Sequence, residues 1–442
     1  MAKLKKIVVV GLWHQGVVGA ACMAEYGYDV IGFDLNRLRI QELNQGNAPL
    51  FEPGLDELIK SGINNKNLRF SSNIQDSFKN RVEVMLMFDI PVDDNDKSDL
   101  SEIYDVVDRI APILEDNTIL YVTAQVAVGT CHEIIKRIKS KNPELEFDLA
   151  YSPENLRLGK AIELFNNPAL PVIGADSSDS FKRARDLLAP LNVEWNHVNL
   201  VTAEMTKHAL NSYLALSVTF GNELGNLCDE IGADGHEIAK MLKLEPRIGK
   251  QAMLRPGLGF SGATLARDIQ TLRSLSSKYN LESPLLDGVW SSNSKQNSLV
   301  IRKIKKIYSS LQDLQISVLG LTYKPDTSTL RRSASLEIIE AIVTEGAKVS
   351  CHDPKADRNE LESYSGFKFY DDPYEALINS KVLILITPWD DYHNLDFMRI
   401  KQHMDSNPLV IDTANILDSK SLDDLGFIYL DIGRGRNTGV SL

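Results

Sequence analysis

The chain has 442 residues, too many for one hydrophobic core, so its length predicts two or three domains. Its hydrophobic fraction of 43% and charged fraction of 24% are ordinary for a globular protein. The net charge of -12, with no long basic run, argues against a nucleic-acid-binding protein, whose affinity depends on cationic contacts to phosphates.

The sequence contains no segment typical of a membrane protein or a secreted protein. No apolar stretch is long enough to span a bilayer, and the apolar run that ends at Gly11 is shorter than a signal peptide requires. The cysteines show no CxxC or Cys/His metal spacing, so we expect no metal site and a reduced, cytoplasmic protein. They are Cys22, Cys131, Cys228 and Cys351.

The N-terminal segment has the layout of a dinucleotide-binding βαβ unit. Residues 7–11 form an apolar run of strand length, and a tight turn covers 11–16. An apolar helix then runs to about Tyr26, and a second strand at 29–33 ends at Asp34. An acidic residue about twenty positions after the turn is typical of this unit.

Within that turn, Gly11 and Gly16 keep two glycines of the fingerprint, whereas Trp13 replaces the middle one. The middle glycine normally lets the backbone approach the pyrophosphate. Asp34 is expected to bind the ribose hydroxyls of NAD. The alternative interpretation is that Asp34 is a plain turn residue at the end of a strand.

Further strand-like runs alternate with helical patterns at 83–88, 118–122 and 147–151. This alternation predicts a parallel sheet covered on both faces, with the ligand crevice in the loops after the strands. Glu154 follows one of these strands and is a candidate site residue. A solvated loop carboxylate is the alternative.

From residue 202 the pattern changes to long helices at 202–231 and 234–244, with a further helical pattern at 286–308. Lys207 and Asn211 are four residues apart and therefore share one helix face. They are either a catalytic pair or two solvated side chains. The length and apolarity of these helices predict a dimer interface.

A glycine-rich loop at 257–264 precedes another helical pattern. Such a loop can present backbone N–H groups to an anion or a reacting centre. Arg267 and Asp268 lie one turn into the helix, where a side chain can reach that centre. The alternative is a turn followed by an ordinary helix. The apolar positions of the helix are Leu265, Ile269, Leu272 and Leu275.

A second α/β half begins near Leu314. The fold class is therefore α/β, with two Rossmann-like, doubly wound parallel-sheet domains joined by a central helical domain. Its strands are expected at 316–320, 348–352, 382–386 and 410–412, with a helix at 333–345.

These residues together resemble the UDP-glucose/GDP-mannose dehydrogenase family over nearly the whole chain. The order and spacing of the motifs are specific to that family. They are Glu52-Pro53-Gly54-Leu55, Tyr151-Ser152-Pro153-Glu154-Asn155-Leu156-Arg157, Lys207 with Asn211, Arg247-Ile248-Gly249, Gly259-Phe260-Ser261-Gly262, Asp268, Gly320-Leu321-Thr322-Tyr323-Lys324-Pro325-Asp326-Thr327, Arg331, Ser333 and Thr387-Pro388-Trp389.

The resemblance implies an NAD-binding domain at 1–200, a helical dimerisation domain at 201–310 and a nucleotide-sugar-binding domain at 311–442. Members typically oxidise a C6 hydroxymethyl group to a carboxylate with two NAD+ per sugar, and a cysteine captures the intermediate aldehyde. The expected substrate is a UDP-sugar, the expected assembly a homodimer, and the expected context polysaccharide biosynthesis.

Site residues follow from the same resemblance. The catalytic candidates are Lys207, Asp268, Glu154, Asn211 and Thr264. The cofactor-binding candidates are Gly11, Gly16, Asp34, Arg267 and Arg331. The substrate-binding candidates are Arg247, Phe260, Gly262, Tyr323 and Lys324.

The sequence departs from the family pattern around the cofactor and the second oxidation. Thr264 stands where the family has its cysteine, and Arg267 stands where it has a lysine. Further departures are Trp13, Ile90, Ala124-Gln125 and Leu158.

A threonine hydroxyl is a far weaker nucleophile than a thiol, so three interpretations remain open. The enzyme stops at the carbonyl, or it completes the oxidation through a hydrated aldehyde. Alternatively, the protein is an inactive nucleotide-sugar-binding relative that serves as a partner or regulator.

Overall fold

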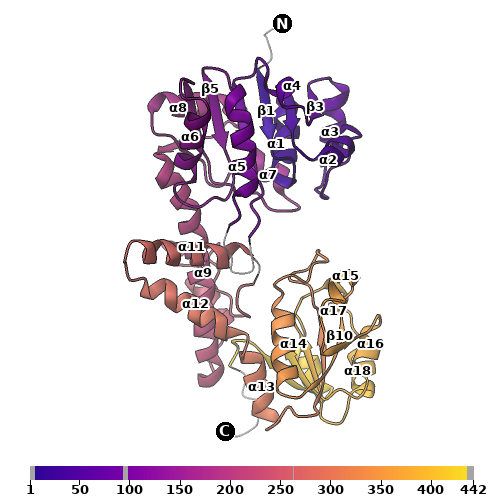
Figure 1. The fold of residues 1–442 in the computed structure, drawn as a ribbon. Coiled ribbons are helices and arrows are strands. Elements are labelled where there is room, and N and C mark those ends of the chain that lie inside the picture. The colour runs from indigo at the N-terminus through magenta and orange to yellow at the C-terminus, as the bar shows by residue number, and fades with distance from the viewer. Residues whose placement is uncertain (1–4, 93–97, 262, 436–442) are drawn as a thin grey trace. The chain divides into compact units, whose positions relative to one another are not determined.

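The computed structural model describes residues 5–92, 98–261 and 263–435. The chain folds into two compact units, residues 1–210 and 211–442, coloured indigo to magenta and magenta to yellow in Figure 1.

Among the described residues of the first unit, eight strands form one sheet in the order β3-β2-β1-β4-β5-β6-β7-β8. This is the doubly wound order with the topological switch between β1 and β4. The strands are β1 (Lys6–Val10), β2 (Asp29–Phe33), β3 (Leu68–Ser71), β4 (Glu83–Leu86), β5 (Thr118–Val122), β6 (Phe147–Tyr151), β7 (Val172–Gly174) and β8 (Asn196–Val198).

Helices of this unit cover both faces of the sheet, as the alternation of strands and helices predicts. They are α1 (His14–Glu25), α2 (Arg37–Asn44), α3 (Leu55–Asn64), α4 (Ile74–Phe78), α5 (Ser101–Ile110), α6 (Thr130–Lys141), α7 (Ala161–Asn166), α8 (Ser178–Leu187) and the start of α9 (Leu200–Ile231), with short 3-10 turns η1 (Ala111–Ile113) and η2 (Ala189–Leu191).

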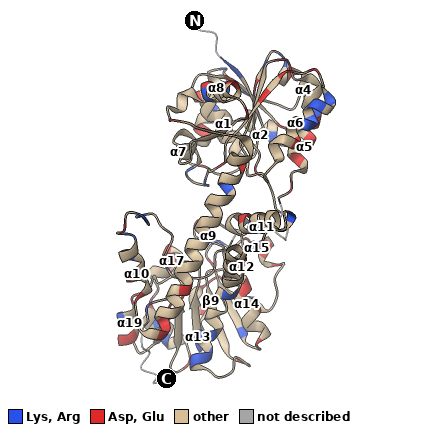
Figure 2. Ribbon diagram, turned by 90° about the vertical axis from the view of Figure 1, so that its left-hand side faces the viewer, with Lys and Arg blue, Asp and Glu red and all other residues tan. Residues whose placement is uncertain are grey.

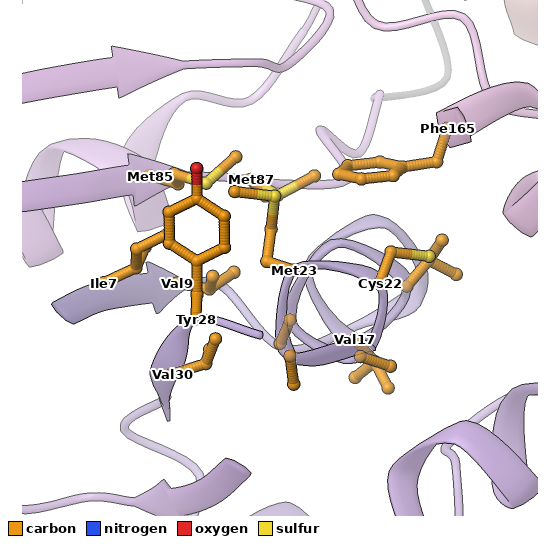
Figure 3. Packing of buried hydrophobic residues seen from close by; sticks show 14 of the residues in the cluster. Ile7, Val9, Val17, Cys22, Met23, Tyr28, Val30, Met85, Met87 and Phe165 are labelled. Carbon is orange, nitrogen blue, oxygen red and sulfur yellow. The ribbon is translucent and has the colours of Figure 1, made fainter. Parts of the chain in front are cut away.

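Alternate residues of β1 belong to different cores. Ile7 and Val9 pack with α1, whereas Val8 and Val10 pack on the opposite face with α5 and α6. Successive strand residues point to opposite faces, so a run of apolar residues buries a strand on both sides. Figure 3 shows the first of these cores around α1.

Within its described residues, the second unit contains the remainder of α9, four further helices that precede the second sheet in the chain, and that sheet with its own helices. The sheet has the order β11-β10-β9-β12-β13-β14, with all pairs parallel. Its strands are β9 (Gln315–Leu319), β10 (Lys348–His352), β11 (Phe367–Phe369), β12 (Val382–Leu385), β13 (Leu409–Asp412) and β14 (Ile428–Asp431).

The four further helices are α10 (Gly235–Leu242), α11 (Ala263–Lys278), α12 (Pro284–Gln296) and α13 (Leu299–Ile307). Those associated with the second sheet are α14 (Ala334–Thr344), α15 (Arg358–Leu361), α16 (Pro373–Ala376), α17 (Asp390–His393), α18 (Phe397–His403) and α19 (Ser419–Asp424).

Two details differ from the sequence prediction. β7 pairs antiparallel with β6, so the first sheet is not wholly parallel. The helical pattern at 286–308 is interrupted, because α12 ends at Gln296 and α13 begins at Leu299. The interruption places the Asn297 side chain between two segments, where its Oδ1 accepts from Gly259 N–H and its Nδ2 donates to Glu337.

Candidate active site

The turn between β1 and α1 requires both of its glycines. Gly11 has φ +91°, and a Cβ there would lie 2.8 Å from the Met87 carbonyl oxygen. A Cβ on Gly16 would lie 1.8 Å from the carbonyl oxygen of Gly11. The turn therefore tolerates no side chain at either position, as a dinucleotide-binding turn demands.

Trp13 directs its side chain into the space beside this turn and remains 40% exposed. The Arg39 guanidinium lies 4.9 Å from the centre of the Trp13 ring, within cation–π range. Arg39 also forms a 2.7 Å ion pair with Asp34. The contact with Arg39 of α2 thus holds the Trp13 indole, which stands where the fingerprint has its middle glycine.

Asp34 lies directly after β2, where the sequence analysis placed it, and hydrogen bonds anchor its carboxylate. It accepts hydrogen bonds from the Leu12 N–H at 2.9 Å and the Asn36 N–H at 2.8 Å, in addition to its pair with Arg39. These bonds fix the carboxylate beside the glycine turn.

A cleft of about 360 Å³ opens beside the turn. Fixed glycines, an anchored acid after β2 and an adjoining cleft fit the adenosine and pyrophosphate part of NAD. The cleft is lined by Gly11, Trp13, Arg39, Phe88, Asp89, Ile90, Pro91 and Glu102.

His14 and Glu52 join this turn to the rest of the unit, a connection that the sequence analysis did not anticipate. The His14 Nε2 lies 3.1 Å from Glu52 Oε2, and both side chains are buried. Glu52 also accepts from the backbone N–H groups of Gly159 and Ala161, each at 2.8 Å. The Glu-Pro-Gly-Leu motif therefore fastens α1 to the segment that enters α7.

Lys207 on α9 is 5% exposed, and its ammonium donates to Asn155 Oδ1 at 3.2 Å. Asn155 follows Glu154, a half-buried carboxylate that accepts from the N–H of Leu156. A lysine is rarely buried without a role. Lys207 on α9 thus bonds the residue next to Glu154 in the loop after β6, so both predicted candidates lie in the same region of the first unit.

Glu204, one helix turn before Lys207, and His208, the residue after it, have structural partners. Glu204 accepts from the N–H groups of Gly129 and Cys131, at 2.6 and 2.8 Å, and so caps the start of α6. The His208 ring bonds the carbonyl oxygen of Val126 at 2.9 Å. These bonds hold the loop after β5, which contains Gln125.

In the second unit, Asn211 Nδ2 donates to Asp268 Oδ2 at 2.5 Å. Both side chains are buried, and Asp268 is 0% exposed. Asp268 lies on α11 one turn after Thr264, which is exposed, so the two share a helix face. Arg267 is buried beside Asp268. The structure therefore joins Asn211 to Asp268.

Three of the described backbone N–H groups of the glycine-rich loop donate to asparagine side chains of the protein. Gly257 donates to Asn222, Gly259 to Asn297 and Phe260 to Asn293, at 2.9, 3.0 and 2.7 Å. Asparagine side chains of α9 and the α12 region therefore shape this loop. Gly262, a predicted substrate residue, lies outside the described residues.

The remaining candidates lie on the surface of the second unit. Arg247 is exposed and pairs with Glu245 at 2.9 Å. Tyr323 is partly exposed, and the Lys324 ammonium lies 5.7 Å from the centre of its ring. Arg331 follows in the same loop, before α14.

None of the chain's four cysteines is suited to nucleophilic chemistry. All four are buried, and burial raises the pKa of each thiol, to about 12 for Cys22 and well above the ordinary value for Cys131 and Cys351. The thiolate is the reactive form, so a raised pKa suppresses attack. No other cysteine compensates for Thr264.

Two other features are absent from the part of the chain that the structure describes. No group of three or more His, Cys, Asp or Glu side chains is arranged to hold a metal ion. No described helix has both the length and the apolarity needed to cross a bilayer.

The doubly wound sheet with its glycine turn forms a dinucleotide-binding unit. Family models give the same result in three consecutive parts. The NAD binding domain of the UDP-glucose/GDP-mannose dehydrogenase family matches residues 5–192, its central domain 201–295 and its UDP binding domain 317–419. The chain belongs to this family, whose members are nucleotide-sugar dehydrogenases.

Known relatives align with almost the whole chain. The UDP-glucose 6-dehydrogenase of Rhizobium meliloti is 32% identical over 438 residues, covering 97% of this chain and 99% of that protein. The UDP-glucose 6-dehydrogenase TuaD of Bacillus subtilis is 29% identical, covering 98% and 94%.

Solved structures share the fold. The UDP-glucose dehydrogenase of Pyrobaculum islandicum superposes with a TM-score of 0.84 at 24% identity, covering 97% of this chain and 98% of that one. An NDP-N-acetyl-D-galactosaminuronic acid dehydrogenase of Methanosarcina mazei gives 0.86 at 22% identity, covering 98% and 96%.

Proposed function

We propose that this protein oxidises the C6 hydroxyl of a UDP-sugar to the carbonyl and stops there, releasing one NADH per sugar. The observation that carries the proposal is Thr264 at the nucleophile position, together with four buried cysteines of raised pKa. Without a thiolate the aldehyde is not captured covalently, and covalent capture is what makes a second hydride transfer accessible.

In the proposed reaction, Gly11, Gly16 and Asp34 would hold NAD+, which would supply the acceptor for the hydride that leaves C6 of the sugar. The hydroxyl proton leaves to a base, for which Asp268 is our candidate, directly or through water. Lys207 and Asn211 stabilise the oxygen as negative charge develops, and Glu154 supports Lys207 from its loop. The products are an aldehyde, NADH and one proton.

The binding roles divide among three proposed domains. Residues 1–200 hold NAD, 201–310 form the dimer, and 311–442 hold the nucleotide. The family's UDP binding domain matches residues 317–419, and the relatives named above are UDP-glucose 6-dehydrogenases, which makes UDP-glucose the first substrate to test. We assign NAD contacts to Gly11, Gly16, Asp34, Arg267 and Arg331, and substrate contacts to Arg247, Phe260, Gly262, Tyr323 and Lys324.

Thr264→Cys is expected to raise the yield from one NADH per sugar to two. A thiol can add to the aldehyde and form the thiohemiacetal from which a second hydride leaves. Thr264→Ala is the matched control and should still give one NADH per sugar, because the hydroxyl has no covalent role. NADH absorbance against sugar consumed measures both. A lower yield in Thr264→Ala than in the wild type would show that the threonine hydroxyl participates.

A second candidate function is nucleotide-sugar binding without hydride transfer. Two observations favour it: Trp13 replaces the middle glycine of the turn, and the Asp89 carboxylate lies against the start of α1. Calorimetry that detects UDP-sugar binding in a protein that forms no NADH would favour this function.

The homodimer is also a proposal, and α9 provides its support. Six positions of this helix follow the alternating three- and four-residue spacing of a coiled-coil seam, and each is partly or fully exposed. Figure 2 shows that this stretch of the helix carries few charged side chains. The seam consists of Tyr213, Ser217, Phe220, Leu224, Leu227 and Ile231.

Phe220→Asp is expected to convert the protein from a dimer to a monomer, because it places a charge at the centre of the seam. Glu223→Gln, an exposed position outside the seam, is the control and should leave the dimer intact. Light scattering coupled to gel filtration measures the mass. A monomeric wild type would refute the dimer.

A further inference from the structure

The N-terminus of α1 is already occupied by a carboxylate of the protein. Asp89 lies in the loop after β4, and its Oδ2 accepts from the Gln15 backbone N–H at 3.0 Å. The first N–H groups of a helix have no partner within the helix and favour an anion. Here that anion is Asp89.

The Gln15 N–H group lies at the phosphate-binding end of α1. In a dinucleotide-binding unit the pyrophosphate lies at the N-terminus of the first helix, directly after the glycine turn. Gln15 strengthens the contact, because its side-chain amide donates to the Phe88 carbonyl oxygen at 3.1 Å. The loop that carries Asp89 is thus fastened to α1 by one backbone bond and one side-chain bond.

We propose that Asp89 sets the cofactor affinity of this protein: its carboxylate competes with the NAD pyrophosphate for the N-terminal N–H groups of α1, so that NAD binds with uptake of a proton. The pyrophosphate is an anion, and two anions cannot share these donors without strong repulsion. Protonating Asp89 removes the repulsion and weakens its own hold on the helix.

The surroundings of Asp89 are consistent with a protonation step. Burial raises the pKa of Asp89 above its ordinary value, although the hydrogen bonds from Gln15 oppose the rise. Burial and the charge of nearby Asp34 also raise the pKa of Glu102, which faces the same cleft from α5. Among the described residues, the other charged or titratable groups that act on Asp89 or Glu102 are Arg39 on α2, Asp99 before α5 and His14 on α1.

The sign of the pH dependence follows from linkage. A bound pyrophosphate raises the pKa of Asp89 further, because it disfavours the carboxylate. NAD therefore binds most tightly below the pKa of Asp89 in the free protein. Affinity falls as the pH rises through that value, and protons are taken up between the free and the bound pKa.

The test is calorimetric binding of NAD+ to the whole protein between pH 5 and 8, in pairs of buffers with different ionisation enthalpies. The wild type is expected to bind more weakly as the pH rises and to take up protons. Asp89→Asn retains an oxygen that can accept from Gln15, so the helix cap survives. We expect this variant to bind NAD+ about tenfold or more tightly at pH 8 and to take up no proton at Asp89.

Two control variants separate this effect from general electrostatics. Glu102→Gln removes another acid from the cleft, and His14→Gln removes a nearby imidazole that bonds Glu52 instead of Asp89; both variants should retain proton uptake. Thermal unfolding of each variant verifies that the fold is intact. An unchanged Kd in Asp89→Asn at pH 8, or wild-type binding without proton uptake at every pH tested, would overturn the proposal.

Discussion

Asp268→Asn is expected to lower kcat by about 10²- to 10⁴-fold, the range that a positioned general acid or base contributes. The carboxylate is fully buried and accepts from Asn211 Nδ2 at 2.5 Å. An asparagine has the same shape and can retain that hydrogen bond through its oxygen, but it cannot take up a proton. Nucleotide-sugar affinity and thermal stability should therefore change little while turnover is lost.

Asp287→Asn is the matched control for this substitution. Asp287 is an exposed aspartate on α12 that pairs with Arg273 at 2.6 Å, and surface ion pairs of this kind contribute little. Its kcat should equal that of the wild type. Wild-type turnover in Asp268→Asn, measured by NADH absorbance at saturating substrate, would remove Asp268 from the proposed reaction.

Lys207→Met is expected to lower kcat by about 10²-fold or more. The ammonium is buried and donates to Asn155, so it is held in one position rather than sampling solvent. Methionine has a similar length and fills the same buried volume, but it offers no charge and no hydrogen-bond donor. Loss of turnover with an unchanged Tm would therefore identify a chemical role for the ammonium.

Lys240→Met provides the comparison for that lysine. Lys240 is exposed on α10 and pairs with Glu237 at 2.6 Å, so its removal should affect neither kcat nor Tm. Equal effects on kcat from Lys207→Met and Lys240→Met would mean that the Lys207 ammonium takes no part in the reaction. A fall in the Tm of Lys207→Met that parallels its loss of activity would likewise mean that Lys207 has only a structural role.

The sequence predicts the sheets best where strands are central and buried. The runs at 29–33, 118–122, 147–151 and 348–352 coincide with β2, β5, β6 and β10. Prediction failed for the short strands toward the edges of the sheets, β3, β7, β8, β11 and β14, which have three or four residues each. A three-residue strand is too short to show a period of two, and only its neighbour in the sheet identifies it.

The break between α12 and α13 has a tertiary cause that no local pattern reveals. The apolar spacing continues across it, but Asn297 is needed to bond Gly259 and Glu337. Helix propensity is a weak preference that such tertiary contacts override.

For the candidate site, spacing along α9 predicted that Lys207 and Asn211 share a face. Their partners, Asn155 and Asp268, are 52 and 57 residues away along the chain, and only the fold brings each pair together. Asp89 was not predicted as a site residue, although its loop was expected to line the ligand crevice. Its only signal in the sequence is an acidic residue directly after a buried strand, and its contact with Gln15 spans 74 residues.

The most direct test of the proposed two-electron oxidation is the number of NADH molecules formed per sugar consumed by the wild-type protein. The measurement uses excess NAD+, a panel of UDP-sugars beginning with UDP-glucose, and mass spectrometry of the product. We expect one NADH per sugar and an aldehyde, because no thiol is placed to capture the intermediate. Two NADH per sugar and a carboxylate product would contradict the proposal and would mean that the second oxidation proceeds without a cysteine.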